Sequence, residues 1–398
     1  MKIKSSARAV FFVFIFVPVL SLSAMDAGFL LDGNVSFNDA EEKAFFVAAL
    51  PWFSIPLGAA AEMYVSGSFR AEYENETIAY VPELMRTELS FRWDNGEFKA
   101  GRIYYADPLG FVTRGYFDGA RLLLDVGVGN LSAGVWYTGL LYKKSAQITM
   151  TEPEMASYNS SLDYADFWNT YFAPRRLIGA LDWEHPSVME KIDLRIALIG
   201  QYDLSGNELF YHSQYLIFKA GIPVNAFTFN LGGCAEVAEL PDAYQISFAG
   251  ELGIGWMLPV SFPNMLTFSG RYSSGTVDDT LTAFIPITTE LQGGILKAKL
   301  SGLSVIRLDY IARLHQTFSL GFQGSYFVLN DLGTYQGRPT GKEGYFLGSE
   351  LYGFLVWSPV SDLRIKGGAG VFLPSLGNAE PNGKMQWGAD IGLTLALY

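Results

Sequence analysis

Apolar and polar residues alternate along most of the chain after residue 24. Within residues 59–73, Val65 and Phe69 fall on one parity, while Glu62 and Arg70 fall on the other. Successive side chains of a β-strand point to opposite faces, so this pattern predicts a strand with one apolar and one polar face. The same alternation recurs over residues 85–93 and 305–314.

The apolar faces indicate which kind of β-protein this is. They are long, they recur along the whole chain and they end in aromatic residues. No apolar run after residue 24 reaches 18 residues, which excludes a spanning helix there. A soluble sandwich also alternates, but its polar face is its surface. This pattern instead predicts an all-β fold, a transmembrane antiparallel β-barrel with lipid outside and water inside.

We predict about 18 strands, an even number as a closed antiparallel barrel requires, with 16 as the alternative. The weakest assignments are the start of the chain and residues 291–299, which fit either a strand or a helix within a long link. The expected strands are residues 28–38, 43–53, 57–73, 84–94, 98–106, 117–128, 131–142, 174–184, 192–203, 208–220, 227–237, 244–257, 265–275, 302–313, 317–328, 344–357, 363–373 and 385–397.

The links between these strands alternate between short and long. We expect the short links, which carry turn residues such as Asn95-Gly96 and Pro359, to face the periplasm. The long links should face the outside. These are Glu74–Glu83, Asp107–Tyr116, Lys143–Ala173, Thr276–Ser301, Leu329–Glu343 and Pro374–Lys384.

The first segment has the features of a cleaved signal peptide. Lys2, Lys4 and Arg8 precede an apolar stretch that is too short to span a membrane as a helix. Ser21 and Ser23 are the small residues that a signal peptidase requires, so we expect residues 1–23 to be removed. Residues 24–398 then form a single barrel domain in the outer membrane.

The composition excludes several functions. The full chain has 28 basic and 40 acidic residues, which argues against nucleic acid as a partner. One cysteine and three histidines leave no disulfide and little for a metal site, so we expect no metal and no cofactor. His212 is adjacent to Ser213, but neighbouring strand residues point to opposite faces. A nucleophile and base cannot pair there, and we predict no enzyme activity.

The polar parity of the strands predicts the wall of the lumen. Its basic and acidic residues are nearly balanced, and nearly all the basic ones are arginines, which form rigid pairs with carboxylates. Two interpretations remain open: ion pairs that fasten the wall, or an arginine ladder that guides carboxylate or sugar solutes. The candidate lumen residues are Arg86, Glu88, Arg92, Arg102, Arg121, Asp125, Arg195, Arg271, Arg307, Asp309, Arg313 and Glu350.

Two long links are long enough to fold inward and narrow the pore, Lys143–Ala173 and Thr276–Ser301. Both contain aromatic residues that either stack on sugar rings or pack the loop onto the wall. The candidates are Tyr164, Phe167, Trp168 and Phe284. Most of the surplus acidic residues lie in the predicted outer links. This placement favours solubility at the outer mouth or a bias toward cations there.

Two stretches resemble the alginate-export-type porins, an 18-stranded outer-membrane family. The first, residues 99–125, has Gly101-Arg102 before a loop and then Phe117-Asp118-Gly119 opening a strand. The second, residues 347–374, has Gly348 and Glu350, a Pro turn and a Gly-rich strand that ends in Phe372 and Pro374. The Phe284-Ile285-Pro286 patch is also similar. The resemblance implies the barrel fold and a porin role.

The resemblance does not extend to a polyanionic substrate, because the wall is balanced and the outer links are acidic. We therefore predict a passive or weakly selective channel for small hydrophilic solutes. The alternative is a surface protein whose long loops bind a ligand or a host component. The expected partners are outer-membrane lipid and the barrel-assembly machinery, which reads an aromatic terminus such as Tyr398. The oligomeric state stays open.

Overall fold

The computed structural model describes residues 25–40, 43–74, 77–151, 154–155, 158, 160–189, 191–206, 210–332 and 344–397. The predicted signal peptide and Tyr398 lie outside these residues. None of the helices in the described ranges has the length and apolar character needed to cross a membrane.

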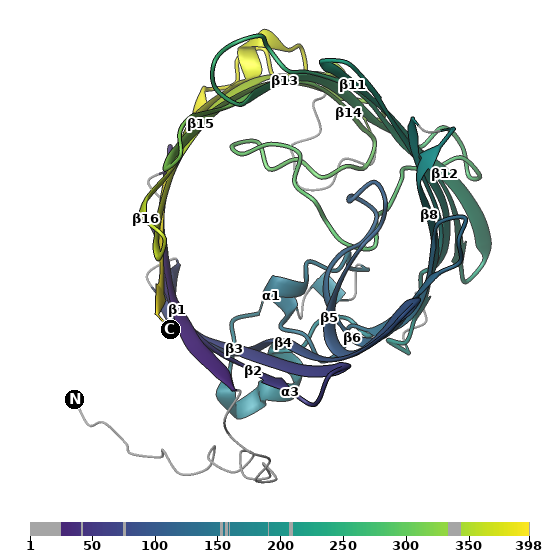
Figure 1. The fold of residues 1–398 in the computed structure, drawn as a ribbon. Helices are drawn as coiled ribbons and strands as arrows, with labels where there is room; N and C mark the ends of the chain where they lie inside the picture. Colours follow the sequence, from purple (N-terminus) through teal and green to yellow (C-terminus); the bar gives the residue numbers. More distant parts are fainter. Residues whose placement is uncertain are drawn as a thin grey trace.

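Eighteen antiparallel strands form one closed sheet, as the alternation of residues predicts (Figure 1). Every strand pairs with its neighbours in sequence, and the barrel closes between the first and last strands, where Phe29 pairs with Leu397. The strands are β1 (Asp26–Asn38), β2 (Lys43–Pro56), β3 (Ala61–Glu74), β4 (Thr77–Trp93), β5 (Gly96–Ala106), β6 (Arg114–Asp125), β7 (Asn130–Tyr137), β8 (Arg176–Val188), β9 (Ile192–Asp203), β10 (His212–Val224), β11 (Phe227–Leu240), β12 (Ala243–Trp256), β13 (Asn264–Ser273), β14 (Leu303–His315), β15 (Phe318–Leu329), β16 (Phe346–Val360), β17 (Leu363–Leu373) and β18 (Gln386–Leu397).

Among the described residues, the named helical elements are short pieces in the long links. These are α1 (Lys143–Ala146), η2 (Tyr164–Asp166), α3 (Phe167–Thr170) and η3 (Pro374–Leu376). Residues 291–299, for which the sequence leaves strand or helix open, form neither; a single antiparallel bridge joins Leu291 to Lys299.

The outer surface of the barrel carries the apolar parity. Phe69, Leu252, Leu351 and Ile391 come from strands around the ring, and each side chain is more than half exposed. A closed barrel satisfies its backbone hydrogen bonds between strands, so it can present such a surface to lipid. The opposite parity faces the lumen.

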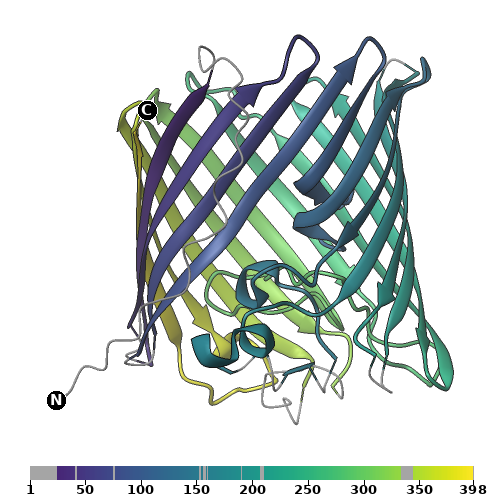
Figure 2. The ribbon, with the colours of Figure 1, turned by 90° about the horizontal axis from the view of Figure 1, so that it is seen from below.

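The links divide into two sets at the two ends of the barrel (Figure 2). One end carries short turns and the other carries the long links, with α1 and α3 among them. One link is shorter than predicted: Glu74–Glu83 is not a loop, because β3 continues to Glu74 and β4 begins at Thr77. Pro82 and Glu83 made this stretch look like a loop, but Pro82 lies in β4.

Most other boundaries differ from the prediction by a few residues, and two of these differences affect the links. β7 ends at Tyr137 rather than at residue 142, so the following loop spans 138–175. The predicted turn at His185-Pro186 lies within β8, which reaches Val188 with an irregular register after His185.

Candidate functional site

Three links of the long-link end fold into the lumen instead of extending away from it (Figure 1). They are the hairpin tip (107–113) between β5 and β6, the 138–175 loop between β7 and β8, and the 274–302 loop between β13 and β14. The sequence predicts that the last two are long enough to do so. The hairpin tip is a third element that length did not reveal.

The three inward links are joined to one another through their backbones. The Thr288 N–H donates to the Val112 carbonyl at 3.1 Å, which joins the 274–302 loop to the hairpin tip. The Thr289 N–H donates to Gln147 O and the Thr149 N–H to Ile287 O, both at 2.9 Å, which joins it to the 138–175 loop. The links therefore form one assembly that narrows the lumen.

An apolar cluster holds the hairpin tip against the inner wall. Leu109 and Phe111 are buried with Phe284 and with wall residues of β8 to β12, including Tyr215. The inner wall makes room for the tip at Gly232 of β11, where a Cβ would overlap the Leu109 side chain. Burial of this apolar surface between loop and wall stabilises the inward position.

Asp107 fixes the conformation of the hairpin tip. Its Oδ1 accepts from the N–H groups of Leu109 and Gly110, and its Oδ2 accepts from those of Val112 and Thr113, all at 2.8–2.9 Å. Burial raises the pKa of the Asp107 carboxyl to about 6, whereas the four N–H donors act in the opposite direction. These four hydrogen bonds to Asp107 hold the tip in place of the backbone hydrogen bonds that a tight turn would form.

Two buried glutamates of the wall hold the 274–302 loop by its backbone. Glu236 of β11 accepts from the Ile285 N–H at 3.0 Å. Glu350 of β16 accepts from the N–H groups of Gly294 at 2.7 Å and Leu296 at 2.8 Å. Each carboxylate therefore fastens the loop and is not open to a solute.

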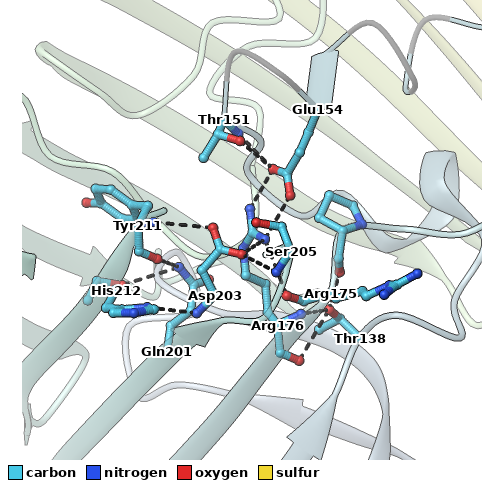
Figure 3. Close-up of polar contacts among 12 residues, drawn as sticks. Thr138, Thr151, Glu154, Arg175, Arg176, Gln201, Asp203, Ser205, Tyr211 and His212 are labelled. Atoms are coloured by element: carbon cyan, nitrogen blue, oxygen red, sulfur yellow. Dashed lines mark hydrogen bonds and ion pairs between the residues drawn. The ribbon is translucent and has the colours of Figure 1, made fainter. Parts of the chain in front are cut away.

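Two buried arginines hold the 138–175 loop. Arg176 of β8 binds Glu154 of the loop through two hydrogen bonds of 2.9 and 2.6 Å, and Asp203 of β9 at 2.8 Å (Figure 3). Arg102 of β5 pairs with Asp118 at 2.7 Å and donates to Leu140 O at 3.1 Å. For these arginines the fastening interpretation holds.

Two cavities remain open on the inner wall, and both are lined by charged residues. One, of about 370 Å³, lies beside β4, β5 and β6. The other, of about 260 Å³, lies over β10 to β14. Basic residues outnumber acidic ones by three to two in each lining. The charged residues are Arg86, Glu88, Glu97, Lys99 and Arg121 in the first, and Lys219, Glu251, Arg271, Arg307 and Asp309 in the second.

Ion pairs orient the charged groups of both cavities. In the first, Glu88 lies 2.8 Å from Arg86 and 3.2 Å from Lys99. In the second, Glu251 lies 3.2 Å from Lys219 and 3.4 Å from Arg271, which also pairs with Glu290 of the 274–302 loop. Glu88 and Glu251 thus each lie between two cations.

The structure divides the predicted lumen residues into three groups. Arg86, Glu88, Arg121, Arg271, Arg307 and Asp309 line the two cavities. Arg102 and Glu350 are buried beneath the inward links. The remaining four lie near the short-link end, where Arg92 pairs with Glu97, Arg195 pairs with Glu184, Arg313 donates to Gln316 O and Asp125 accepts from the Gly127 N–H.

The predicted constriction aromatics do not face one site. Phe284 is fully buried between Phe111 and Tyr215, which is the packing role and not the stacking role. Tyr164 and Trp168 are exposed on the part of the 138–175 loop that lies against β4. Phe167 stacks on Tyr171 of the same loop, with ring centroids 4.5 Å apart.

Sequence reasoning missed several residues of the two cavities. Lys99 has the parity of Glu97, and Lys219 has that of the buried Tyr215, so alternation places both lysines inward. Tyr104 and Tyr116, which line the first cavity, carry no such signal. They lie on the part of the β5–β6 hairpin that has turned into the lumen. There, alternate residues no longer divide between a lipid-facing and a lumen-facing side.

The closed 18-stranded barrel with loops folded into its lumen is the fold of a porin. No family profile and no curated protein sequence matches this chain. Solved porins of Pseudomonas aeruginosa have the same fold at low identity. OccK5 (OpdH) superposes with a TM-score of 0.63 at 11% identity, covering 94% of this chain and 98% of that one.

Two further neighbours were solved with a bound small molecule. OpdK with vanillate gives a TM-score of 0.63 at 10% identity, and OccK2 (OpdF) in complex with glucuronate gives 0.62 at 12% identity. Each alignment covers 94% of this chain and 98% of the neighbour. At this identity the similarity establishes the fold.

Proposed function

We propose that this protein is an outer-membrane channel for the diffusion of small hydrophilic solutes. The observation that carries the proposal is the lumen itself. Buried wall charges fasten two of the three inward links, an apolar cluster holds the third, and two charged cavities lie beside them. A loop assembly held in this way narrows a pore without filling it, which is how a porin obtains selectivity.

The solutes we infer are small carboxylates, including sugar acids. Three cations face two carboxylates in each cavity, so each lining attracts an anion of low charge. The porins OpdK and OccK2 were solved with vanillate and glucuronate, both small carboxylates. The resemblance to alginate-export-type porins agrees with a porin role but does not identify a substrate.

The location of the protein in the outer membrane and its route there follow from the same proposal. The exposed apolar parity of the strands faces outer-membrane lipid, and the barrel-assembly machinery inserts the chain after signal-peptide removal. The 274–302 loop directs its backbone N–H groups to carboxylates of the lumen wall. This arrangement favours a channel over a surface-binding protein.

The test is single-channel recording of purified, folded protein in planar bilayers, with a salt gradient to measure the reversal potential. We expect unitary conductance steps that decrease when glucuronate is added on one side. Glucose at the same concentration is the control for a neutral solute. Folded, heat-modifiable protein that produces no unitary steps would refute the channel. Steps that respond equally to glucose and glucuronate would refute the carboxylate preference alone.

A further inference from the structure

The barrel wall lacks a strand ladder between the first half of β4 and β7. β4 pairs with β5 only over Thr87–Trp93, and β6 pairs with β7 only over Asp118–Asp125. Beyond these residues the β5–β6 hairpin turns into the lumen. Thr77–Arg86 of β4 therefore has no neighbouring strand on this side in the described part of the chain. An open edge of this kind is not tolerated in lipid unless other groups satisfy it.

Tyrosine hydroxyls satisfy two carbonyl groups of this edge, at the place where a neighbouring strand would otherwise lie. The Tyr171 hydroxyl donates to the Pro82 carbonyl at 2.6 Å, and the Tyr164 hydroxyl donates to the Tyr80 carbonyl. Alternate carbonyls of one strand point to the same side, so both face the gap. Pro82 suits this position because it has no N–H that would need an acceptor.

Arg102 satisfies a further carbonyl group of β4, at the point where the β5–β6 hairpin leaves the wall. Its guanidinium donates to the Leu84 carbonyl of β4 and to the Leu140 carbonyl of the 138–175 loop, the latter at 3.1 Å. Ser145 of the same loop donates to the Glu83 carboxylate at 2.9 Å. Each of these hydrogen bonds to β4 uses a side chain.

The covering segment is a small unit of its own, which we call the seam flap (residues 139–146 and 160–173). Its two arms pair with each other: the Lys143 N–H donates to Tyr171 O and the Ala173 N–H to Leu141 O, both at 2.9 Å. These bonds extend the β7–β8 hairpin. The seam flap therefore holds together through its own backbone bonds, whereas the bonds that join it to β4 at Tyr80, Pro82, Glu83 and Leu84 use side chains.

The seam separates two different environments. On the outside, Ile78 and Tyr80 of β4 and Trp168 of the seam flap present exposed apolar side chains. Within the seam, Val81 is buried with Tyr142 and Tyr171, and further apolar side chains pack against this cluster. On the lumen side of β3, Arg70 pairs with Glu72 at 2.9 Å. Val81 pairs with Arg70 in the register of β3 and β4, so the aromatic cluster adjoins the charged lumen wall.

We propose that the seam flap is a lateral gate between the lumen and the outer leaflet. The molecule it admits is amphipathic, with an alkyl chain that passes the aromatic seam and a polar head that stays with the charged lumen wall. This goes beyond the aqueous channel and does not depend on which hydrophilic solute that channel carries.

The experiment measures access to the seam from lipid. Val81→Cys is introduced into a Cys234→Ala background, and the protein in proteoliposomes is treated with N-dodecylmaleimide dissolved in the bilayer. Removing both tyrosine hydroxyls (Tyr164→Phe with Tyr171→Phe) should raise the labelling rate at residue 81 about tenfold, because two bonds that close the gate are lost. Each single Phe variant should give a smaller increase.

The matched control is Ala48→Cys in the same background. Ala48 is as buried as Val81 and faces inward from β2, but its strand has ladders on both sides. Its labelling should stay slow in every background. Equal rates at residues 48 and 81, or no response of residue 81 to any Phe variant that folds, would overturn the gate. Faster labelling of residue 81 by a charged, water-soluble maleimide would show entry from the lumen and would also overturn it.

Discussion

At the residue scale, the carboxylate of Asp107 determines the shape of the hairpin tip. It accepts four backbone N–H groups, two on each oxygen. Asp107→Asn offers one acceptor oxygen, so two buried N–H groups lose their partner at about 1–3 kcal/mol each. We expect the tip to loosen and the unitary conductance and its noise to rise, as recorded in planar bilayers.

Asp278→Asn is the control for this change. Asp278 also accepts two backbone N–H groups, from Thr280 and Leu281, but on a single oxygen and at an exposed position. An asparagine oxygen can keep both bonds, so conductance should not change. If Asp107→Asn conducts like the unmodified protein, the tip does not limit the pore.

Glu350 gives a second prediction at this scale. Its Oε1 accepts from Gly294 N–H and its Oε2 accepts from Ile295 and Leu296 N–H. Glu350→Gln retains one acceptor oxygen and should loosen the 274–302 loop. Limited proteolysis of folded protein should then cleave this loop faster.

Glu184→Gln is the comparison, because Glu184 is a half-exposed wall glutamate that pairs with Arg195 and holds no loop. Its cleavage pattern should match that of the unmodified protein. Similar cleavage of the Glu350→Gln and Glu184→Gln variants would contradict the anchoring role.

Glu350 also shows where sequence reasoning ends at this scale. Alternation along β16 places it inward, and the structure does the same. Whether an inward side chain meets water or a loop depends on contacts across the lumen, between residues more than 50 positions apart. Phe284 follows the same logic, since only the position of the hairpin tip decides that it is buried.

At the element scale, the β5–β6 hairpin is the part of the molecule that departs most from a regular barrel. Its tip contributes Leu109, Phe111 and Val112 to the apolar cluster inside the lumen. Replacing residues 107–113 with Asn-Gly, a favoured hairpin turn, removes these contacts and keeps the strands. We expect a folded barrel with larger conductance and a lower melting temperature.

The control shortens the link between β12 and β13 by deleting residues 259–261, which are exposed at the short-link end. Conductance should then change little. A shortened hairpin tip with unchanged conductance would show that the other two loops alone set the pore size.

The strands were predictable from alternation because nearly all of them separate a lipid-facing side from a water-facing side. β4 shows the exception. Pro82 made its first half resemble a loop, and proline in a strand does indicate an edge without a ladder. Read in that way, Pro82 would have located the gap between β4 and β7. The hairpin tip had its own signal, an apolar Leu109 to Val112 stretch between polar residues.

At the scale of the whole molecule, selectivity depends on where charge is exposed. The full chain carries 12 more acidic than basic residues, yet both cavities have a cationic surplus. Neutralising Arg86 and Lys99 (to Gln) should shift the reversal potential toward cation selectivity. We expect the permeability ratio to change roughly twofold, since local potentials in a narrow lumen outweigh distant charges.

Lys191→Gln is the control for total charge, because Lys191 is exposed in the turn between β8 and β9. It removes a positive charge at the short-link end and should leave the reversal potential nearly unchanged. Equal shifts from a cavity lysine and from Lys191 would mean that overall charge, and not the cavities, sets selectivity.

The way Glu236 and Glu350 hold the 274–302 loop has a consequence for how such a pore diversifies. Both carboxylates bind N–H groups, which every residue except proline possesses. At Ile285, whose N–H group Glu236 binds, the side chain does not take part in this bond and can be exchanged while the path of the loop is retained, whereas packing fixes Phe284. Natural variation or engineering can change which solutes are admitted by substituting a few loop residues while the barrel is unchanged.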